Sequence, residues 1–140
     1  RNARRFAMTA PRLDLQIRRA YDPPSSDDGT RILIDRLWPR GLRKDGAHID
    51  HWLKDLAPSP ALRVWFGHQP ERFAEFSNRY TAELDALADD SAALQTLREA
   101  LRAGRVTLLF AAHDPQLNHA RVLEDWLRRP HAWLSARKVK

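Results

Sequence analysis

The chain contains three stretches whose hydrophobic pattern is typical of β-strands. In residues 13–21 apolar and polar residues alternate, which predicts a strand with one buried face. After a loop rich in Pro, Ser, Asp and Gly, residues 31–37 are rich in branched apolar side chains and predict a second strand that ends before Pro39 and Gly41. Residues 106–111 are continuously apolar and predict a strand buried on both faces, in the middle of a sheet.

Four other stretches predict helices. Ser59 is expected to cap a short helix that has Pro60 in its first turn and ends at Gly67. Residues 69–87 place apolar side chains three and four positions apart, and residues 91–103 and 118–129 do the same. Residues 47–59 fit either a short strand around 49–53 or a helical turn, and an irregular segment is favoured.

Strands interspersed with helices predict an α/β fold: a single small domain with a short, mostly parallel sheet flanked by helices. The domain is expected to span residues 13–129, between a basic tail at 1–12 and a second basic tail at 130–140, in which Trp133 and Leu134 are candidates for packing. Met8 is the only methionine, and residues 1–7 are excluded from the fold prediction.

Charge and composition restrict the functional classes. The 140 residues carry a net charge of +6, but residues 1–19 and 128–140 contribute +5 each and leave −4 for the body. This distribution weakens a nucleic-acid interface on the body and leaves basic tails as an alternative, which predicts steeply salt-dependent binding. There is no Cys, which excludes disulfides and a Cys nucleophile, and no apolar run long enough for a membrane span. We therefore expect a cytoplasmic protein.

The end of the second predicted strand carries the first group of candidate site residues. Asp35 and Arg36 are expected to be the last strand residues, with Trp38, Arg40 and Gly41 in the turn. Two arginines beside a Gly turn can bind a carboxylate or phosphate, and Arg40, after the bend at Pro39, is expected to reach further than Arg36. Asp35 is a candidate for proton transfer and Trp38 for a pocket wall. The alternative is that Arg36 pairs with a protein carboxylate and Arg40 is solvated.

The end of the buried strand carries the second group. Asp114 follows the strand, and Asn118 and His119 open the last predicted helix, whose first turn favours anions. His119 is a candidate general acid or base. Alternatively, Asn118 is a helix cap and His119 a structural side chain. The two strand ends lie at one edge if the strands are parallel.

Residues 52–68 supply a third group. Lys54 is a possible anion ligand, and Trp65 a possible pocket wall, with a solvated Lys54 and a core position for Trp65 as the alternatives. There is no Gly-rich nucleotide loop, no metalloprotease helix and no nucleophile elbow, and the six His are scattered, so we expect neither a metal nor a cofactor.

Three long strings carry a family resemblance: "YDPPSSDDGTRILIDRLWPRGL", "WLKDLAPSPALRVWFGHQPERFAEFSNRY" and "VTLLFAAHDPQLNHARVL". They resemble the YeaO-like branch of the domain-of-unknown-function 488 proteins, an α/β family without a settled activity. In related branches a Cys-His-Arg triplet stands where this chain has Asn118, His119 and Ala120. The resemblance then implies that cysteine chemistry is absent here while His119 is retained.

The leading hypothesis is a strand-end pocket for a small anionic or nucleotide-like ligand, with or without an enzymatic activity. Arg36 and Arg40 would bind the anion, and Asp35 and His119 are the candidates for proton transfer. The competing hypothesis is a nucleic-acid-associated or regulatory module that uses the basic tails. A third possibility is a homodimer formed through exposed Trp side chains, and the sequence leaves the oligomeric state open.

Overall fold

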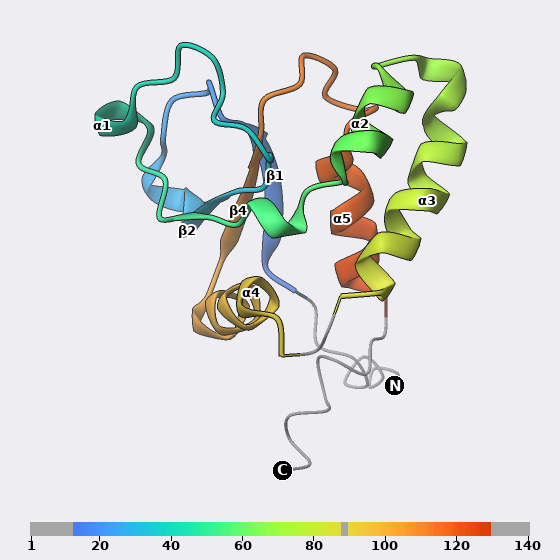
Figure 1. Ribbon diagram of the computed structural model, residues 1–140. Helices are drawn as coiled ribbons and strands as arrows, with labels where there is room; N and C mark the ends of the chain where they lie inside the picture. Colours follow the sequence, from blue (N-terminus) through green and yellow to red (C-terminus); the bar gives the residue numbers. More distant parts are fainter. Residues whose placement is uncertain (1–12, 88–89, 130–140) are drawn as a thin grey trace, which may run out of the picture.

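The computed structural model describes residues 13–87 and 90–129, which form a four-stranded sheet with helices around it (Figure 1). In chain order the elements are β1 Leu15–Arg19, β2 Thr30–Leu33, α1 Lys44–Ala47, β3 His51–Trp52, α2 Pro60–Phe66, α3 Phe73–Asp85, α4 Ala92–Ala103, β4 Val106–Phe110 and α5 His119–Arg128. Single 3₁₀ turns lie at Ser26–Asp28, Lys54–Leu56 and Pro70–Arg72. The predicted α/β class is confirmed.

The sheet has the order β1-β4-β2-β3, and all pairs among the described strands are parallel. β4 lies between β1 and β2, and all five of its residues are buried, as its continuous apolar pattern predicted. Val106 lies opposite both Leu15 and Thr30, so the three strands begin at the same level. Their carboxyl ends therefore meet at one edge of the sheet.

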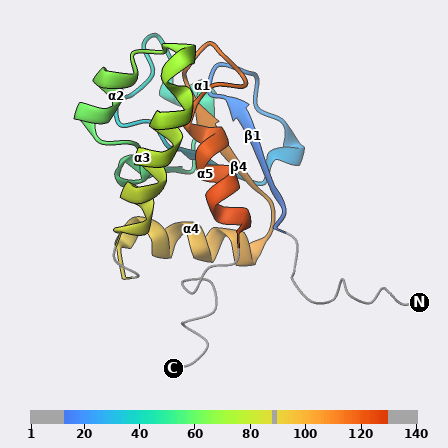
Figure 2. The same cartoon turned by 90° about the vertical axis from the view of Figure 1, so that its right-hand side faces the viewer.

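The two faces of the sheet are covered differently. Helices α2, α3 and α5 gather on one side, and α4 crosses the end where the strands begin (Figures 1 and 2). The main core lies on this side and includes Ile32, Leu108 and Leu123. On the other side Leu33 and Leu109 pack beneath the segment that contains α1, with partly buried Trp38, Leu42, Ile49 and Trp52.

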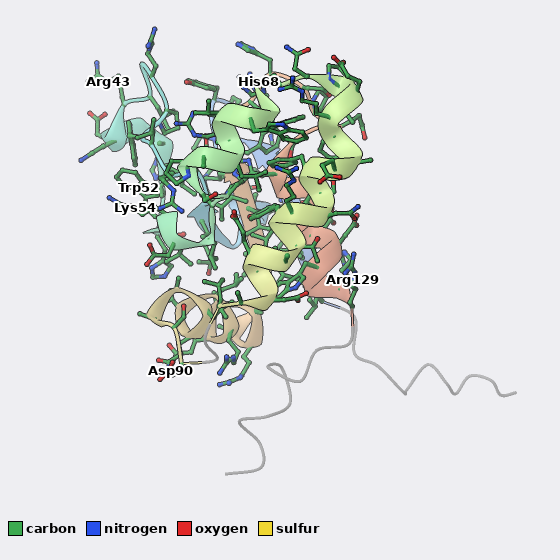
Figure 3. All side chains as sticks on the ribbon, turned by 45° about the vertical axis from the view of Figure 1, so that its right-hand side comes forward. Arg43, Trp52, Lys54, His68, Asp90 and Arg129 are labelled. Atoms are coloured by element: carbon green, nitrogen blue, oxygen red, sulfur yellow. The ribbon has the colours of Figure 1, made fainter. Side chains whose placement is uncertain are left out.

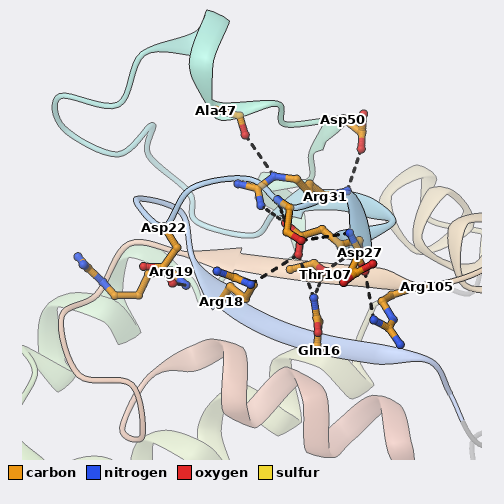
Figure 4. A network of polar contacts seen from close by, with 12 residues as sticks. Gln16, Arg18, Arg19, Asp22, Asp27, Arg31, Ala47, Asp50, Arg105 and Thr107 are labelled. Atoms are coloured by element: carbon orange, nitrogen blue, oxygen red, sulfur yellow. Dashed lines mark hydrogen bonds and ion pairs between the residues drawn. The ribbon is translucent and has the colours of Figure 1, made fainter.

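A buried polar network lies on this second face, around Asp28 (Figure 4). Its carboxylate accepts hydrogen bonds from the Ser25 N–H and from Gln16, and forms an ion pair with buried Arg31. The Thr107 hydroxyl donates to the Asp28 carbonyl at 2.7 Å. Burial raises the pKa of Asp28, but the Ser25 N–H and the Arg31 guanidinium outweigh burial and hold it below its usual value. The network ties β1, β2 and β4 together.

The helix boundaries follow from local capping. The Ser59 hydroxyl accepts from the Leu62 N–H at the start of α2, and Gly67 ends that helix in the left-handed conformation at φ 51°. Ser91 caps α4 in the same way, through the Leu94 N–H. These caps were predicted from the sequence and are confirmed.

Two predictions need correction. β2 ends at Leu33 and not at residue 37, so Asp35 and Arg36 follow the strand. The Ile34 N–H still donates to the Leu109 carbonyl at 3.1 Å. After Ile34 the backbone pairing with β4 ends, and the Ala111 N–H donates to the Asp35 side chain. Residues 47–59, for which an irregular segment was favoured, contain the short edge strand β3 and the 3₁₀ turn Lys54–Leu56, so the alternative of a short strand around 49–53 is closer to the structure. The two basic tails lie outside the described residues.

Candidate functional site

A cavity of about 520 Å³ lies beyond the carboxyl ends of β2 and β4, with α2 and α5 beside it. Its polar lining comes from the loops after both strands and from the starts and ends of the neighbouring helices: Asp35, Arg36, Arg63, His68, His113, Asp114, Asn118 and His119. Phe66 and Phe76 form an apolar wall, with stacked rings 4.4 Å apart at 20°. This position matches the general rule that α/β sheets bind ligands at their carboxyl edge.

Asp35 and His119 lie in close contact in the lining. Nε2 of His119 lies 3.1 Å from Oδ1 of Asp35 and 3.0 Å from the carbonyl oxygen of Ile34. The orientation is that of a hydrogen bond only toward Ile34, so Oδ1 of Asp35 is buried beside Nε2 without a hydrogen bond to a described residue. Oδ2 of Asp35 accepts from the Ala111 N–H at 3.2 Å. One carboxylate thus joins the loop after β2, the loop after β4 and the start of α5.

Tyr80 supports the imidazole from the helix side. Its ring lies 6.2 Å from that of His119, and its hydroxyl donates to the Leu56 carbonyl. Tyr80 is fully buried, and burial raises the pKa of its phenol well above the usual range, with the charges of Glu83 and Asp35 adding to the effect. The phenol therefore stays neutral and acts as a structural support.

Two arginines hold the backbone walls of the cavity. Arg36 donates from Nε to the Pro58 carbonyl and from Nη2 to the Ala57 carbonyl, both at 3.3 Å. Arg19 donates to the carbonyls of Ala112 at 2.9 Å and Ala111 at 3.1 Å. Because a guanidinium is planar, two bonds each fix its orientation.

The start of α5 is closed by side-chain caps. Asn118 is buried; its Oδ1 accepts from the Arg121 N–H at 3.1 Å and its Nδ2 donates to the Asp114 carbonyl at 2.8 Å. The N–H groups of Gln116 and Leu117 bond to the carboxylate of Asp114 and lower its pKa. Asn118 thus serves as the helix cap that was its alternative interpretation.

The structure brings together only some of the predicted site residues. Asp35, Arg36, Asp114, Asn118 and His119 line the cavity, whereas five others do not: Trp38, Arg40, Gly41, Lys54 and Trp65. Arg40 was expected to reach a ligand more easily than Arg36; in the structure Arg36 lines the cavity and Arg40 does not. The chain turns at Pro39 toward the second face, where the Tyr21 hydroxyl bonds to the Arg40 carbonyl at 2.7 Å.

The three aromatic and basic residues of this group have other surroundings. Trp38 donates from Nε1 to the Leu42 carbonyl and packs against Trp52, over which Lys54 lies at 4.2 Å. Figure 3 shows Trp52 and Lys54 together, well away from His68 at the end of α2. Trp65 lies beneath the guanidinium groups of Arg72 and Arg79, at 5.1 Å and 4.5 Å.

Sequence reasoning missed several lining residues. Arg63 was treated as an ordinary helix residue, yet it lines the cavity, and no hydrogen bond or ion pair joins its guanidinium to another described residue. The signal was present, since Arg63 lies three positions before Phe66 and the two therefore share a face of α2. Arg19 was read only as a strand residue, and nothing in its local pattern pointed to the loop after β4.

Comparison with known proteins decides the family. The chain matches the family described as "Inactive DUF488-N3 subclade" over residues 14–137.

The chain belongs to this DUF488 family.

It is 45% identical over 113 residues to the uncharacterized protein Rv3073c of Mycobacterium tuberculosis, covering 81% of this chain and 92% of the relative. It is 40% identical over 116 residues to the uncharacterized protein YeaO of Escherichia coli K12, covering 83% and 98%. The resemblance to the YeaO-like branch is thereby confirmed. No solved structure matches the chain.

The described residues of this family member contain neither a grouping of metal ligands nor a helix able to cross a membrane. Within 13–87 and 90–129, no three or more His, Asp or Glu side chains are grouped so that they could hold a metal ion. The helices described in the same ranges are all too short or too polar to cross a membrane.

Proposed function

We propose that this chain binds a small anionic molecule in the cavity beyond β2 and β4 and does not react covalently with it. The observation that carries the proposal is the lining. Arg36 and Arg63 line the same cavity as an apolar wall. The described lining contains no Ser, Thr, Cys, Lys or Tyr nucleophile, and its two carboxylates already accept backbone N–H groups.

The lining contains two arginines and two carboxylates. The protein already engages both carboxylates, whereas the arginines keep donors that no other described residue engages. Asp35 is engaged by the Ala111 N–H and by His119, and Asp114 by two backbone N–H groups. Arg36 keeps Nη1 without a partner among the described residues, and Arg63 has its whole guanidinium available. An anion beside these groups would form charge-assisted hydrogen bonds in surroundings of low polarity.

Two considerations favour binding without chemistry. The matching family carries the word "inactive" in its description, and the family resemblance implies a cysteine in related branches at the position of Asn118. Here that position is occupied by a buried amide that caps α5. Asp35 and His119, the candidates for proton transfer, would then orient the ligand and hold the strand ends together.

The test is calorimetric titration with inorganic phosphate and with benzoate at fixed ionic strength, using Arg63→Gln and the control Arg102→Gln. Arg102 is exposed on α4 and does not line the cavity. We expect Arg63→Gln to weaken the binding of whichever anion the wild type binds more tightly by roughly tenfold or more, which is the effect of one charge-assisted hydrogen bond. Absence of binding to the wild type, or an equal loss in Arg102→Gln, contradicts the proposal.

A further inference from the structure

The two ring nitrogens of His119 have different surroundings. Nε2 faces the Ile34 carbonyl at 3.0 Å and the Asp35 carboxylate at 3.1 Å. Both groups only accept hydrogen bonds, so a hydrogen on Nε2 is required for this arrangement. In a neutral imidazole the other nitrogen, Nδ1, is then an acceptor.

Nδ1 has no hydrogen-bond partner within the described part of the chain, and His119 lines the cavity. The side chain is 14% exposed, so little solvent is available to Nδ1 once a ligand fills the space. An acceptor enclosed without a donor costs about 1–3 kcal/mol. Arg36 lines the same cavity, but its Nε and Nη2 donate to the Pro58 and Ala57 carbonyls. No described group donates to Nδ1, so a ligand that encloses this nitrogen would have to supply the donor.

The apolar wall sets the shape of such a ligand. Phe66 and Phe76 are buried, with their rings stacked, and both line the same cavity as His119. A flat ring packs against aromatic faces with good contact and little loss of conformational entropy. The cavity thus combines an aromatic wall, a hydrogen-bond acceptor at Nδ1 of His119 and two arginines.

We infer that the ligand is a planar ring acid that also carries a ring N–H, and that Nδ1 of His119 accepts the hydrogen bond from that N–H. This inference rests on the proposed function and assigns a chemical class to its ligand. The acid group binds Arg63 and Nη1 of Arg36, the ring packs on Phe66, and His119 selects against acids that lack a donor.

Three probes separate these contributions. Orotate offers a planar ring, ring N–H groups and a carboxylate; benzoate lacks the N–H, and uracil lacks the carboxylate. In calorimetric titrations at pH 8, where an ordinary imidazole is neutral, orotate is expected to bind at least tenfold more tightly than either. His119→Phe keeps a ring but removes the acceptor, so within this variant the preference for orotate over benzoate should disappear.

A second measurement is independent of how the variant folds. Nitrogen-15 NMR of the wild type reports which ring nitrogen of His119 is protonated. We expect the hydrogen on Nε2, with an unprotonated Nδ1 whose resonance shifts when orotate is added and does not shift with benzoate. A hydrogen on Nδ1, or equal affinity for orotate and benzoate, overturns the inferred hydrogen bond from the ligand N–H to Nδ1. The proposed binding of an anion is not affected by either result. If neither acid binds, the proposed function fails and this inference fails with it.

Discussion

Oδ1 of Asp35 lies 3.1 Å from Nε2 of His119, and Oδ2 of the same carboxylate accepts the Ala111 N–H. Asp35 follows β2, Ala111 follows β4 and His119 begins α5. A single side chain therefore holds three segments that are distant in sequence at the edge of the cavity. We therefore expect the Asp35 side chain to contribute to the stability of the fold, which can be measured without knowing the ligand.

Asp35→Ala should lower the free energy of unfolding by about 1–3 kcal/mol, because it leaves the Ala111 N–H without its acceptor and removes the carboxylate beside Nε2 of His119. Asp35→Asn keeps an amide oxygen for Ala111 and should lose less, about 1 kcal/mol. Urea unfolding followed by circular dichroism measures both. Asp45→Ala is the control, since that side chain is 75% exposed and should change stability by less than about 0.5 kcal/mol. Equal stability of Asp35→Ala and the wild type would show that the pair is incidental.

Gly29 should not tolerate a side chain. Its φ is 66°, and a Cβ atom would lie 2.2 Å from the carbonyl oxygen of Arg105, which accepts the Thr30 N–H at the start of β2. Gly29→Ala is expected to cost about 2–4 kcal/mol, from backbone strain and displacement of that bond. Gly46→Ala, inside α1 with nothing within 4 Å, should be neutral or slightly stabilising. Thermal unfolding of the two variants decides the matter, and similar melting temperatures would contradict the close approach.

The network around Asp28 predicts a loss of stability in acid. Burial raises the pKa of Asp28, but the Ser25 N–H and the Arg31 guanidinium lower it further than burial raises it, so it lies below the ordinary value of 3.8. A carboxyl whose pKa is lower in the folded state stabilises that state fully above the ordinary value, and this contribution disappears as the pH falls through the folded-state pKa. Carbon-13 NMR of the Asp28 carboxyl should give a midpoint below 3.8. Urea midpoints of the wild type should fall over the same range, and a titration midpoint above 3.8 would refute the assignment.

Ser59 and Glu83 should show strong energetic coupling. The Ser59 hydroxyl donates to Oε2 of Glu83 at 2.6 Å and its N–H to Oε1 at 2.8 Å, while Oγ also caps α2. A double-mutant cycle of Ser59→Ala and Glu83→Gln is expected to give a coupling energy of about 0.5–3 kcal/mol. Ser91→Ala supplies the comparison, because it removes only the cap of α4 and should add independently to Glu83→Gln. Additive effects of Ser59 and Glu83 would mean that the contact between α2 and α3 contributes little.

Features that depend on neighbouring residues were predictable from the sequence. The spacing of Phe76, Tyr80 and Leu84 identifies the buried face of α3, and the caps at Ser59 and Ser91 fix where two helices begin. The continuous apolar run of β4 gives its central position, because a strand covered on both faces has no polar side to present to water. The parallel sheet then explains why two separate strand ends meet.

Features that depend on the path of the chain after a strand could not be predicted. Arg36 and Arg40 have the same chemistry and similar surroundings in sequence, and the turn at Pro39 alone decides which of them lines the cavity. Arg19 reaches the carbonyls of Ala111 and Ala112 because β1 is paired with β4, a fact that no local pattern contains. Trp65 and Phe66 are adjacent aromatic residues of α2, and no local pattern decides that Phe66 and not Trp65 lines the cavity.

The position of β4 in the sheet also sets the order in which the chain can acquire its structure during synthesis. β1 and β2 both pair with β4 and not with each other, and β4 begins only at Val106. While the ribosome has released fewer residues than this, β1 has no partner and β2 has only β3, so neither rim of the cavity is complete. The cavity therefore forms in one late step, and a chain interrupted before residue 110 should lack both the complete sheet and the cavity.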